Sequence, residues 1–259
     1  MKQVKKFISN KISLTIIGLI LFFLIWEIIS LSSKNATMIF PDPFMTIKQA
    51  FIYLGESYTY KCIWGTLKRT LIGFTFSFVS ALFAGVIVGN FTNVKHIFNP
   101  TIIALKTIPT AALVFIFLVI GGAKNTPIYI VVLISFPILY ESVVGGYSNI
   151  DNDIKNVLKV DGGHFFCDNF KVKLPLAFPY IAVGIASSFA LSFKISIMAE
   201  VIAGSTSPGL GSVIKANQNS NPSNMVPIFA YSFIAIIIAL LTSLTTYLVK
   251  KKFPDFSSK

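Results

Sequence analysis

Ionisable side chains lie within or at the ends of long apolar runs of the sequence, at Glu141, Lys194 and Glu200. A charge is costly inside a membrane and usually marks the path of an ion or solute, so these residues favour translocation over catalysis. Glu141 is expected either to pair with Lys106 or to extend to the headgroups, and Lys194 could attract an anionic solute. Lys194 and Glu200 are six residues apart, so on one helix they point away from each other and are not expected to pair.

A glycine-rich segment follows Glu200 and reads Glu-Val-Ile-Ala-Gly-Ser-Thr-Ser-Pro-Gly-Leu-Gly211. It is uncharged after its first residue, so it can change shape at low cost but offers few fixed ligands. A tight binding site needs convergent polar groups, which are missing here. We therefore predict an outer gate or docking lip of the pathway rather than a tight substrate site. The residues predicted for the pathway and outer gate are Lys194, Glu200, Gly204, Gly209 and Gly211.

The sequence contains no recognisable catalytic constellation. It has no GxxxxGK[ST] phosphate loop and no G-x-S-x-G nucleophile elbow, and Gly209-Leu-Gly211 lacks the third glycine of a dinucleotide motif. His96 and His164 stand in short polar links without a second ligand at metal spacing. Cys62 and Cys167 carry no metal or redox signature. We expect a chain that is not an enzyme and that uses no cofactor or metal.

The composition of the chain indicates that membrane-spanning helices position the ionisable side chains Glu141, Lys194 and Glu200. Hydrophobic residues make up 54% of the chain and charged residues 12%, which is more apolar surface than a soluble domain of this length needs. Six segments approach the roughly 20 apolar residues that cross a bilayer, and they lie at about 13–31, 70–91, 101–121, 127–147, 177–198 and 227–249. The predicted fold is all-α, a polytopic membrane protein with six transmembrane helices, the first retained rather than cleaved.

Within these segments, small residues and prolines predict how the helices pack. Gly73, Gly85, Gly89 and the small residues between them form one wall of the second segment, where another backbone can approach closely. Pro109 and Pro137 are expected to bend the third and fourth segments.

The chain has a net charge of +12. The positions of its lysines indicate a membrane topology rather than a surface that binds nucleic acid. Lysines cluster before the first segment, between the fourth and fifth, and after the sixth, and such clusters mark the cytoplasmic side. Both termini and the 148–176 loop are therefore predicted to be cytoplasmic, with 32–66 and 203–226 outside. Glu27, beside Trp26, is expected at the outer headgroups. The single arginine, Arg69, is interpreted as codon usage without mechanistic meaning.

The 148–176 loop is a polar segment between two apolar runs. On a helix its apolar residues fall on one side and its polar residues on the other: Ile154, Val157, Leu158 and Phe165 against Lys155, Asn156 and Lys159. Gly162-Gly163 is predicted to divide the loop into two short arms. Such a hinged amphipathic element either inserts into a groove on another protein or lies on lipid headgroups.

The sequence resembles the membrane permease subunits of binding-protein-dependent ABC importers, in particular the nitrate/sulfonate/taurine group. The resemblance begins at Phe40-Pro-Asp-Pro43 and continues through Thr66–Phe74 and Lys106–Pro109 to the 148–176 loop and Glu200–Gly211. The loop is similar to the coupling motif of that family, whose glycine and Leu-Pro match Gly162, Leu174 and Pro175. The Glu-Ala-Ala triplet of the motif is replaced by Asn156, Val157 and Leu158.

The resemblance implies an ABC transporter type-1 transmembrane domain at 60–249, preceded by a basic tail, first helix and outer segment at 1–59 and followed by a basic tail at 250–259. It implies a cytoplasmic ATPase dimer, an external solute-binding protein and a second permease copy as partners, in the plasma membrane. The implied ATPase-coupling residues are Ile154, Asn156, Val157, Leu158, Asp161, Gly162, Gly163, Phe165, Leu174 and Pro175. A secondary carrier is the alternative, and substrate identity stays open.

Overall fold

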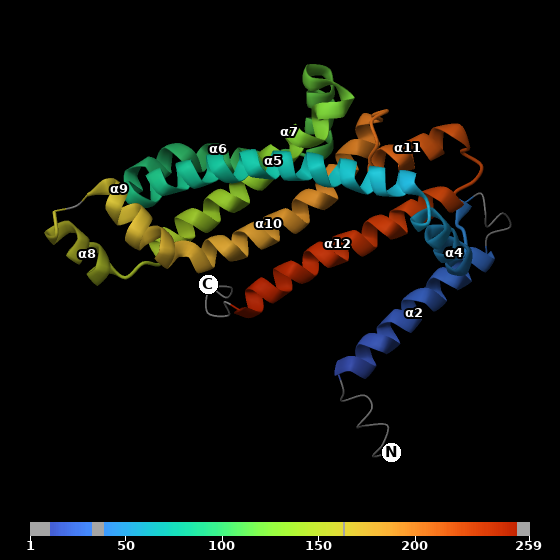
Figure 1. Cartoon of the computed structure of the whole chain (residues 1–259), viewed down its shortest axis with the longest axis horizontal. Helices are drawn as coiled ribbons and strands as arrows, with labels where there is room; N and C mark the ends of the chain where they lie inside the picture. Colours follow the sequence, from blue (N-terminus) through green and yellow to red (C-terminus); the bar gives the residue numbers. More distant parts are fainter. Residues whose placement is uncertain (1–10, 33–38, 163, 253–259) are drawn as a thin grey trace, which may run out of the picture. The chain divides into compact units, whose positions relative to one another are not determined.

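The computed structural model describes residues 11–32, 39–162 and 164–252, and every element in these ranges is helical (Figure 1). The elements are α2 Lys11–Ser32, α4 Pro43–Leu54, α5 Ser57–Asn90, η1 Thr92–Val94, α6 Lys95–Thr107, α7 Thr110–Ser148, α8 Asn152–Val160, α9 Phe165–Asp168, the π-helical turn η2 Asn169–Lys173, α10 Leu174–Ala203, α11 Leu210–Ser220 and α12 Val226–Lys252. The all-α prediction is confirmed for this part of the chain. Gly163, residues 1–10 of the basic N-terminal segment and 253–259 of the C-terminal tail lie outside the described residues.

Five helices in the described ranges are long and apolar enough to cross a membrane, at 14–32, 57–90, 110–148, 165–203 and 226–252. The predicted third segment, 101–121, is not one of them because the chain breaks at Pro109. Proline lacks an N–H and disfavours helical backbone in the residue before it. Ile108 is accordingly extended, with φ −65° and ψ 129°, so α6 ends at Thr107. The expected bend at Pro109 is therefore a complete interruption.

A second break divides α7 at Gly122, between the predicted segments 101–121 and 127–147. Gly122 has φ 70° and ψ 164°, outside the helical region, and helix resumes directly after it. Because a positive φ is accessible to glycine without steric cost, this residue type permits the break. Pro137, in contrast, lies inside the continuing helix.

The chain divides into two compact units, one formed by residues 1–60 and 214–234 and the other by 61–213 and 235–259. Aromatic residues hold the first unit together. The Trp26 ring contacts Phe229 at 6.2 Å between centroids, and its Nε1 donates a hydrogen bond of 2.9 Å to the carbonyl of Pro41. Asp42 is extended and caps α4 by accepting a 2.7 Å hydrogen bond from the Met45 N–H.

In the second unit, α5 packs along the part of α7 that follows Gly122 (Figure 1). The close approaches pair Gly73 with Val131, Gly85 with Val143 and Gly89 with Tyr147. A Cβ built on Gly85 would lie only 2.6 Å from the Val143 Cβ, which confirms the predicted small-residue wall. Because both residue numbers rise together, α5 and this part of α7 run parallel.

Helix α10 packs on α7 in the opposite direction. The close approaches pair Gly146 with Ala177, Ser142 with Gly184 and Ser135 with Ser192, whose hydroxyl oxygens are 2.6 Å apart. As one residue number rises the other falls, so the two helices are antiparallel. Helix α12 is joined to α10 by a hydrogen bond of 2.7 Å from the Thr246 hydroxyl to the carbonyl of Ala186. These registers determine which helix ends meet at each end of the unit.

Candidate functional site

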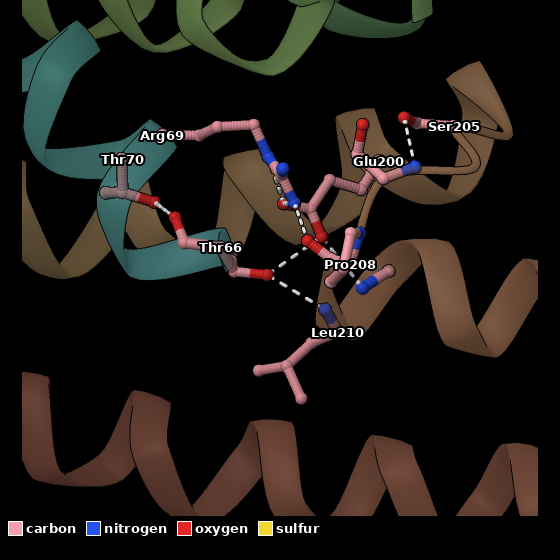
Figure 2. A network of polar contacts seen from close by, with 9 residues as sticks. Thr66, Arg69, Thr70, Glu200, Ser205, Pro208 and Leu210 are labelled. Carbon is pink, nitrogen blue, oxygen red and sulfur yellow. Dashed lines mark hydrogen bonds and ion pairs between the residues drawn. The ribbon is translucent and has the colours of Figure 1, made fainter. Parts of the chain in front are cut away.

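Glu200 is the centre of a buried polar network near the C-terminal end of α10 (Figure 2). Its exposed fraction is 0%. Arg69, on α5, donates to its Oε1 from Nε at 2.9 Å and from Nη2 at 2.7 Å. The Thr66 hydroxyl and the Gly211 backbone N–H each donate to Oε2 at 2.9 Å. Both carboxylate oxygens therefore have the donors that a buried charge requires.

The same network fixes the segment that connects α10 to α11. Gly204 ends α10 in the left-handed conformation, with φ 62°. Arg69 also donates from Nη2 to the carbonyl of Pro208 at 2.8 Å. The Leu210 backbone N–H donates to the Thr66 hydroxyl oxygen at 2.8 Å. One arginine and one threonine of α5 thus hold both the carboxylate and the connecting segment.

Gly209 and Gly211 provide close packing rather than the conformational freedom expected from the sequence. A Cβ on Gly211 would lie 2.6 Å from the Glu200 Cβ, and a Cβ on Gly209 would lie 2.6 Å from Glu200 Oε2. On the facing helix, a Cβ on Gly65 would collide with the carbonyl of Pro208. Side chains at these positions would push the segment away from its partners. The segment is therefore tightly packed against α5 and α10.

The interpretation of Arg69 as codon usage is wrong. A guanidinium presents parallel N–H donors in a planar fork that a lysine ammonium lacks, and both Nε and Nη2 bind one Glu200 oxygen here. The use of arginine at one position in a chain that otherwise uses lysine is the signal that could have indicated this pair. The outer-gate role of Glu200 stays a prediction, and the structure shows that its carboxylate is enclosed by its donors.

The sequence predicted that Lys194 and Glu200 do not pair, and this is confirmed. The Lys194 side chain is exposed. It lies in an apolar groove of about 330 Å³ between α10 and α12, together with Ile197, Ala235, Ile236, Ala239, Leu240 and Ser243. Among the described residues, no acidic side chain lines this groove. The ammonium group therefore stands beside apolar side chains, where it offers hydrogen-bond donors to an incoming group.

The alternative left open for Glu141 is decided by its geometry. Lys106 Nζ, on α6, lies 2.8 Å from both carboxylate oxygens of Glu141, on α7. The two side chains are 47% and 49% exposed, so this ion pair is only half-buried. The predicted pairing is confirmed, and it joins the two helices on either side of the Pro109 break.

The 148–176 loop folds as two short arms, as predicted. Helix α8 ends at Val160, Gly162 has φ 97°, and α9 begins at Phe165. The exposed apolar residues of α8 are Val157 and Val160, at 66% and 89%. The second arm adds exposed aromatic rings at Phe165, Phe166 and Phe170. This loop therefore presents an apolar surface on both sides of its hinge.

Not all of the predicted coupling residues are on that surface. Ile154 and Leu158 are half-buried, whereas Asn156 and Asp161 are exposed. Leu174 and Pro175 begin α10, so they lie at the membrane end of the loop rather than on its tip. Lys155 and Lys159, expected to face away from the apolar side, line a cavity together with Leu158. Gly163 lies outside the described residues.

The comparisons with known proteins agree with one another. A family model described as "Binding-protein-dependent transport system inner membrane component" matches residues 77–253. The nitrate import permease protein NrtB of Leptolyngbya laminosa is 25% identical over 245 residues, covering 89% of this chain and 84% of that protein. SsuC of Bacillus subtilis, named for aliphatic sulfonates transport, is 25% identical over 232 residues, covering 88% and 82%. A structure of the MetNI methionine ABC transporter in an inward facing conformation gives a TM-score of 0.63 at 17% identity, covering 75% of this chain and 95% of that chain.

Proposed function

Because the chain belongs to the family of binding-protein-dependent transport system inner membrane components, we propose that its helices line a path for a small oxyanion and that α8 couples this path to a cytoplasmic ATPase. The chain is the permease subunit of an ABC importer, a multi-pass protein of the plasma membrane. This membership decides against the secondary carrier considered from the sequence.

The helix directions support six membrane crossings rather than five. Helix α5 and the part of α7 after Gly122 run parallel, so the chain must return across the membrane between Asn90 and Gly122. That interval contains the three-residue turn η1, α6 and the first part of α7. At about 1.5 Å per residue, the 13 residues of α6 extend about 20 Å, too short to cross alone. The two pieces together form the broken third crossing.

With six crossings, both termini and the 148–176 loop are cytoplasmic and the 205–211 segment is outside. The transmembrane domain occupies 60–249 in this arrangement, after an N-terminal part at 1–59 and before the tail at 250–259. A Lys159→Cys variant, in a background lacking Cys62 and Cys167, is expected to react with an impermeant maleimide only after the cells are opened. A Thr206→Cys variant is expected to react in intact cells. Labelling of the Lys159→Cys variant from outside would contradict the topology.

The exposed apolar face of α8 is the observation that carries the coupling role. A lone aliphatic side chain in water gains free energy when it is buried in a partner groove. The side chains of Val157 and Val160 are exposed in the described chain. The glycine hinge at Gly162 lets the two arms of the loop adjust to the surface of a partner. The proposed partners are an ATPase dimer at this loop, an external solute-binding protein at the outer segment and a second permease copy.

Lys194 supports an anionic substrate. It lies nine residues before the end of α10, about 14 Å along the helix axis, and its groove contains Ala239, which lies 11 residues, about 16 Å, before Lys250. Both separations are about half of a hydrocarbon core of about 30 Å. A charge at that depth avoids lipid and faces water or a ligand. Two relatives are named for nitrate and for aliphatic sulfonates, and both solutes are oxyanions.

Uptake of nitrate and of an aliphatic sulfonate by vesicles holding the complete importer tests this role. A hydrogen bond to a charged group contributes about 1.5–3 kcal/mol, so Lys194→Gln is expected to slow uptake about tenfold or more. Lys194→Arg should keep most of the rate, and Lys124→Gln, which removes an exposed lysine beside the Gly122 break, should have little effect. Normal uptake by Lys194→Gln of whichever anion the wild type transports would exclude the role.

A further inference from the structure

A cavity of about 490 Å³ lies beside α8, where the rest of the 148–176 loop, including α9 and η2, meets the ends of α5 and α7. Its lining residues come from all of these elements: Gly89, Asn90, Phe91, Tyr147, Ile150, Asn152, Lys155, Leu158, Lys159, Phe165, Asp168 and Lys173. The rings of Phe91 and Phe165 stack at 6.2 Å and form part of its wall. The coupling role of α8 leaves this cavity without a function.

The cavity is strongly basic. Lys155 and Lys159 reach it from α8, Lys173 reaches it from η2, and Asp168 is the acidic residue in its lining. Three lysines and one aspartate give a net charge of +2 (3 − 1). Within the described residues, Lys155 Nζ makes one long hydrogen bond, of 3.4 Å, to the carbonyl of Ser148. Like charges that share one cavity repel each other, so the arrangement is unfavourable until an anion enters.

A network of hydrogen bonds fixes the position of Lys173 at the wall of this cavity formed by α5 and η2. Lys173 Nζ donates to Asn90 Oδ1 at 2.6 Å, and Asn90 Nδ2 donates to Asn169 Oδ1 at 2.7 Å. Asn169 is 2% exposed and donates in turn to the carbonyl of Phe165 at 2.7 Å. An ammonium group has three donors, and this network uses one of those of Lys173. The position of that charge is therefore set before any ligand arrives.

Tyr147 supplies an independent indication of a ligand. It is 1% exposed and lines the cavity, and its hydroxyl has no hydrogen-bond partner within the described chain. Gly89 makes room for the ring, because a Cβ there would lie 2.6 Å from the Tyr147 Cγ. Buried hydroxyl groups are normally hydrogen-bonded, so an unpaired one beside three lysines indicates a missing acceptor.

We propose that this cavity binds a phosphate-type oxyanion and that the bound anion ties α8 to η2 and to the ends of α5 and α7. The anion would accept hydrogen bonds from Lys155, Lys159, Lys173 and the Tyr147 hydroxyl. Its location on the cytoplasmic side rests on the proposed topology. Two sources carry this chemistry, the headgroup of an anionic phospholipid and a free phosphate, and basic pockets beside cytoplasmic helix ends are suited to the former.

The test uses the full-length permease, purified without its partners, in nanodiscs of phosphatidylcholine. Added inorganic phosphate is expected to raise the Tm, because a ligand that binds the folded state stabilises it. Replacing a quarter of the lipid with phosphatidylglycerol is expected to raise the Tm if the headgroup is the source. Lys155→Gln combined with Lys159→Gln should abolish either shift. Lys171→Gln, which removes a lysine of the same loop outside the cavity, should retain it.

Tyr147→Phe separates a ligand contact from a structural role. The hydroxyl is unpaired in the free protein, so its removal should leave the ligand-free Tm unchanged or higher, while phosphate or phosphatidylglycerol binds at least about tenfold more weakly. A shift with phosphate identifies the free anion, and a shift with phosphatidylglycerol alone identifies the headgroup. The proposal is overturned if neither probe raises the Tm, or if Lys171→Gln loses the shift as the double variant does.

This binding experiment is independent of transport. A permease that binds neither probe but imports solute with its ATPase would retain the proposed function and lose only the anion site. A permease that binds the anion but fails to associate with an ATPase would show the reverse.

Discussion

Replacing Glu200 with glutamine is expected to destabilise the permease strongly and to reduce the amount of folded protein in the membrane. The Arg69 guanidinium would remain buried without its counter-charge, and the new amide group would face the donors Thr66 and Gly211. Breaking a buried ion pair by removing one partner costs about 3–5 kcal/mol. The measurement is the Tm of the purified variant in detergent, together with its yield relative to the wild type.

The ion pair of Lys106 and Glu141 provides a matched control in the same chain. Its side chains are about half exposed, so Glu141→Gln should cost less than about 1 kcal/mol. Arg69→Met should be as harmful as Glu200→Gln, and the double variant should lose clearly less than the sum of the two, because neither charge is left alone. Additive losses, or equal losses at Glu200 and Glu141, would show that the buried pair is not the stabilising unit.

A buried structural role for Glu200 differs from the docking role expected for the 205–211 segment. If Glu200 acted as an exposed contact for a binding protein, Glu200→Gln would reduce transport and leave the protein intact. The enclosed carboxylate instead fixes the shape of the 205–211 segment through its hydrogen bonds with Arg69, Thr66 and Gly211. A partner that docks outside would therefore meet a preformed surface.

Replacing Val157 with aspartate is expected to abolish association with the ATPase while leaving the permease folded. Val157 is 66% exposed, so a carboxylate there remains in water in the isolated permease. In the complex, the same position would bury a charge in an apolar groove and lose about 1.5 kcal/mol or more of apolar burial. The measurement is the fraction of ATPase that co-purifies with the tagged permease, with Val157→Thr as an intermediate substitution.

His164→Asp is the matched control for this variant, because it places a carboxylate in the same loop outside the predicted coupling residues. It should leave association unchanged. Leu158 is not a suitable position for this test, since its half-buried side chain belongs to the packing of the loop itself. Normal ATPase association of the Val157→Asp variant would show that α8 does not dock through this face.

The sequence determined the features that depend on neighbouring residues. Long apolar runs predict membrane helices because the bilayer requires backbone hydrogen bonds to close within each segment. The amphipathic pattern around Val157, followed by Gly162, predicts two arms, because glycine alone adopts the required positive φ without cost. Pro109 marked the site of an interruption, although the pattern did not show whether the helix would bend or end there.

The tertiary structure decided the features that depend on helix register. Arg69 and Glu200 are 131 residues apart, and no local pattern indicates that α5 brings one to the other. The cavity beside α8 likewise exists only because the ends of α5 and α7, together with α9 and η2, lie next to Lys155 and Lys159. Local periodicity fixes which face of a helix is apolar, but the partner of that face is selected by close packing at Gly73, Gly85 and Gly89. The buried ion pair and the basic cavity are consequences of that register.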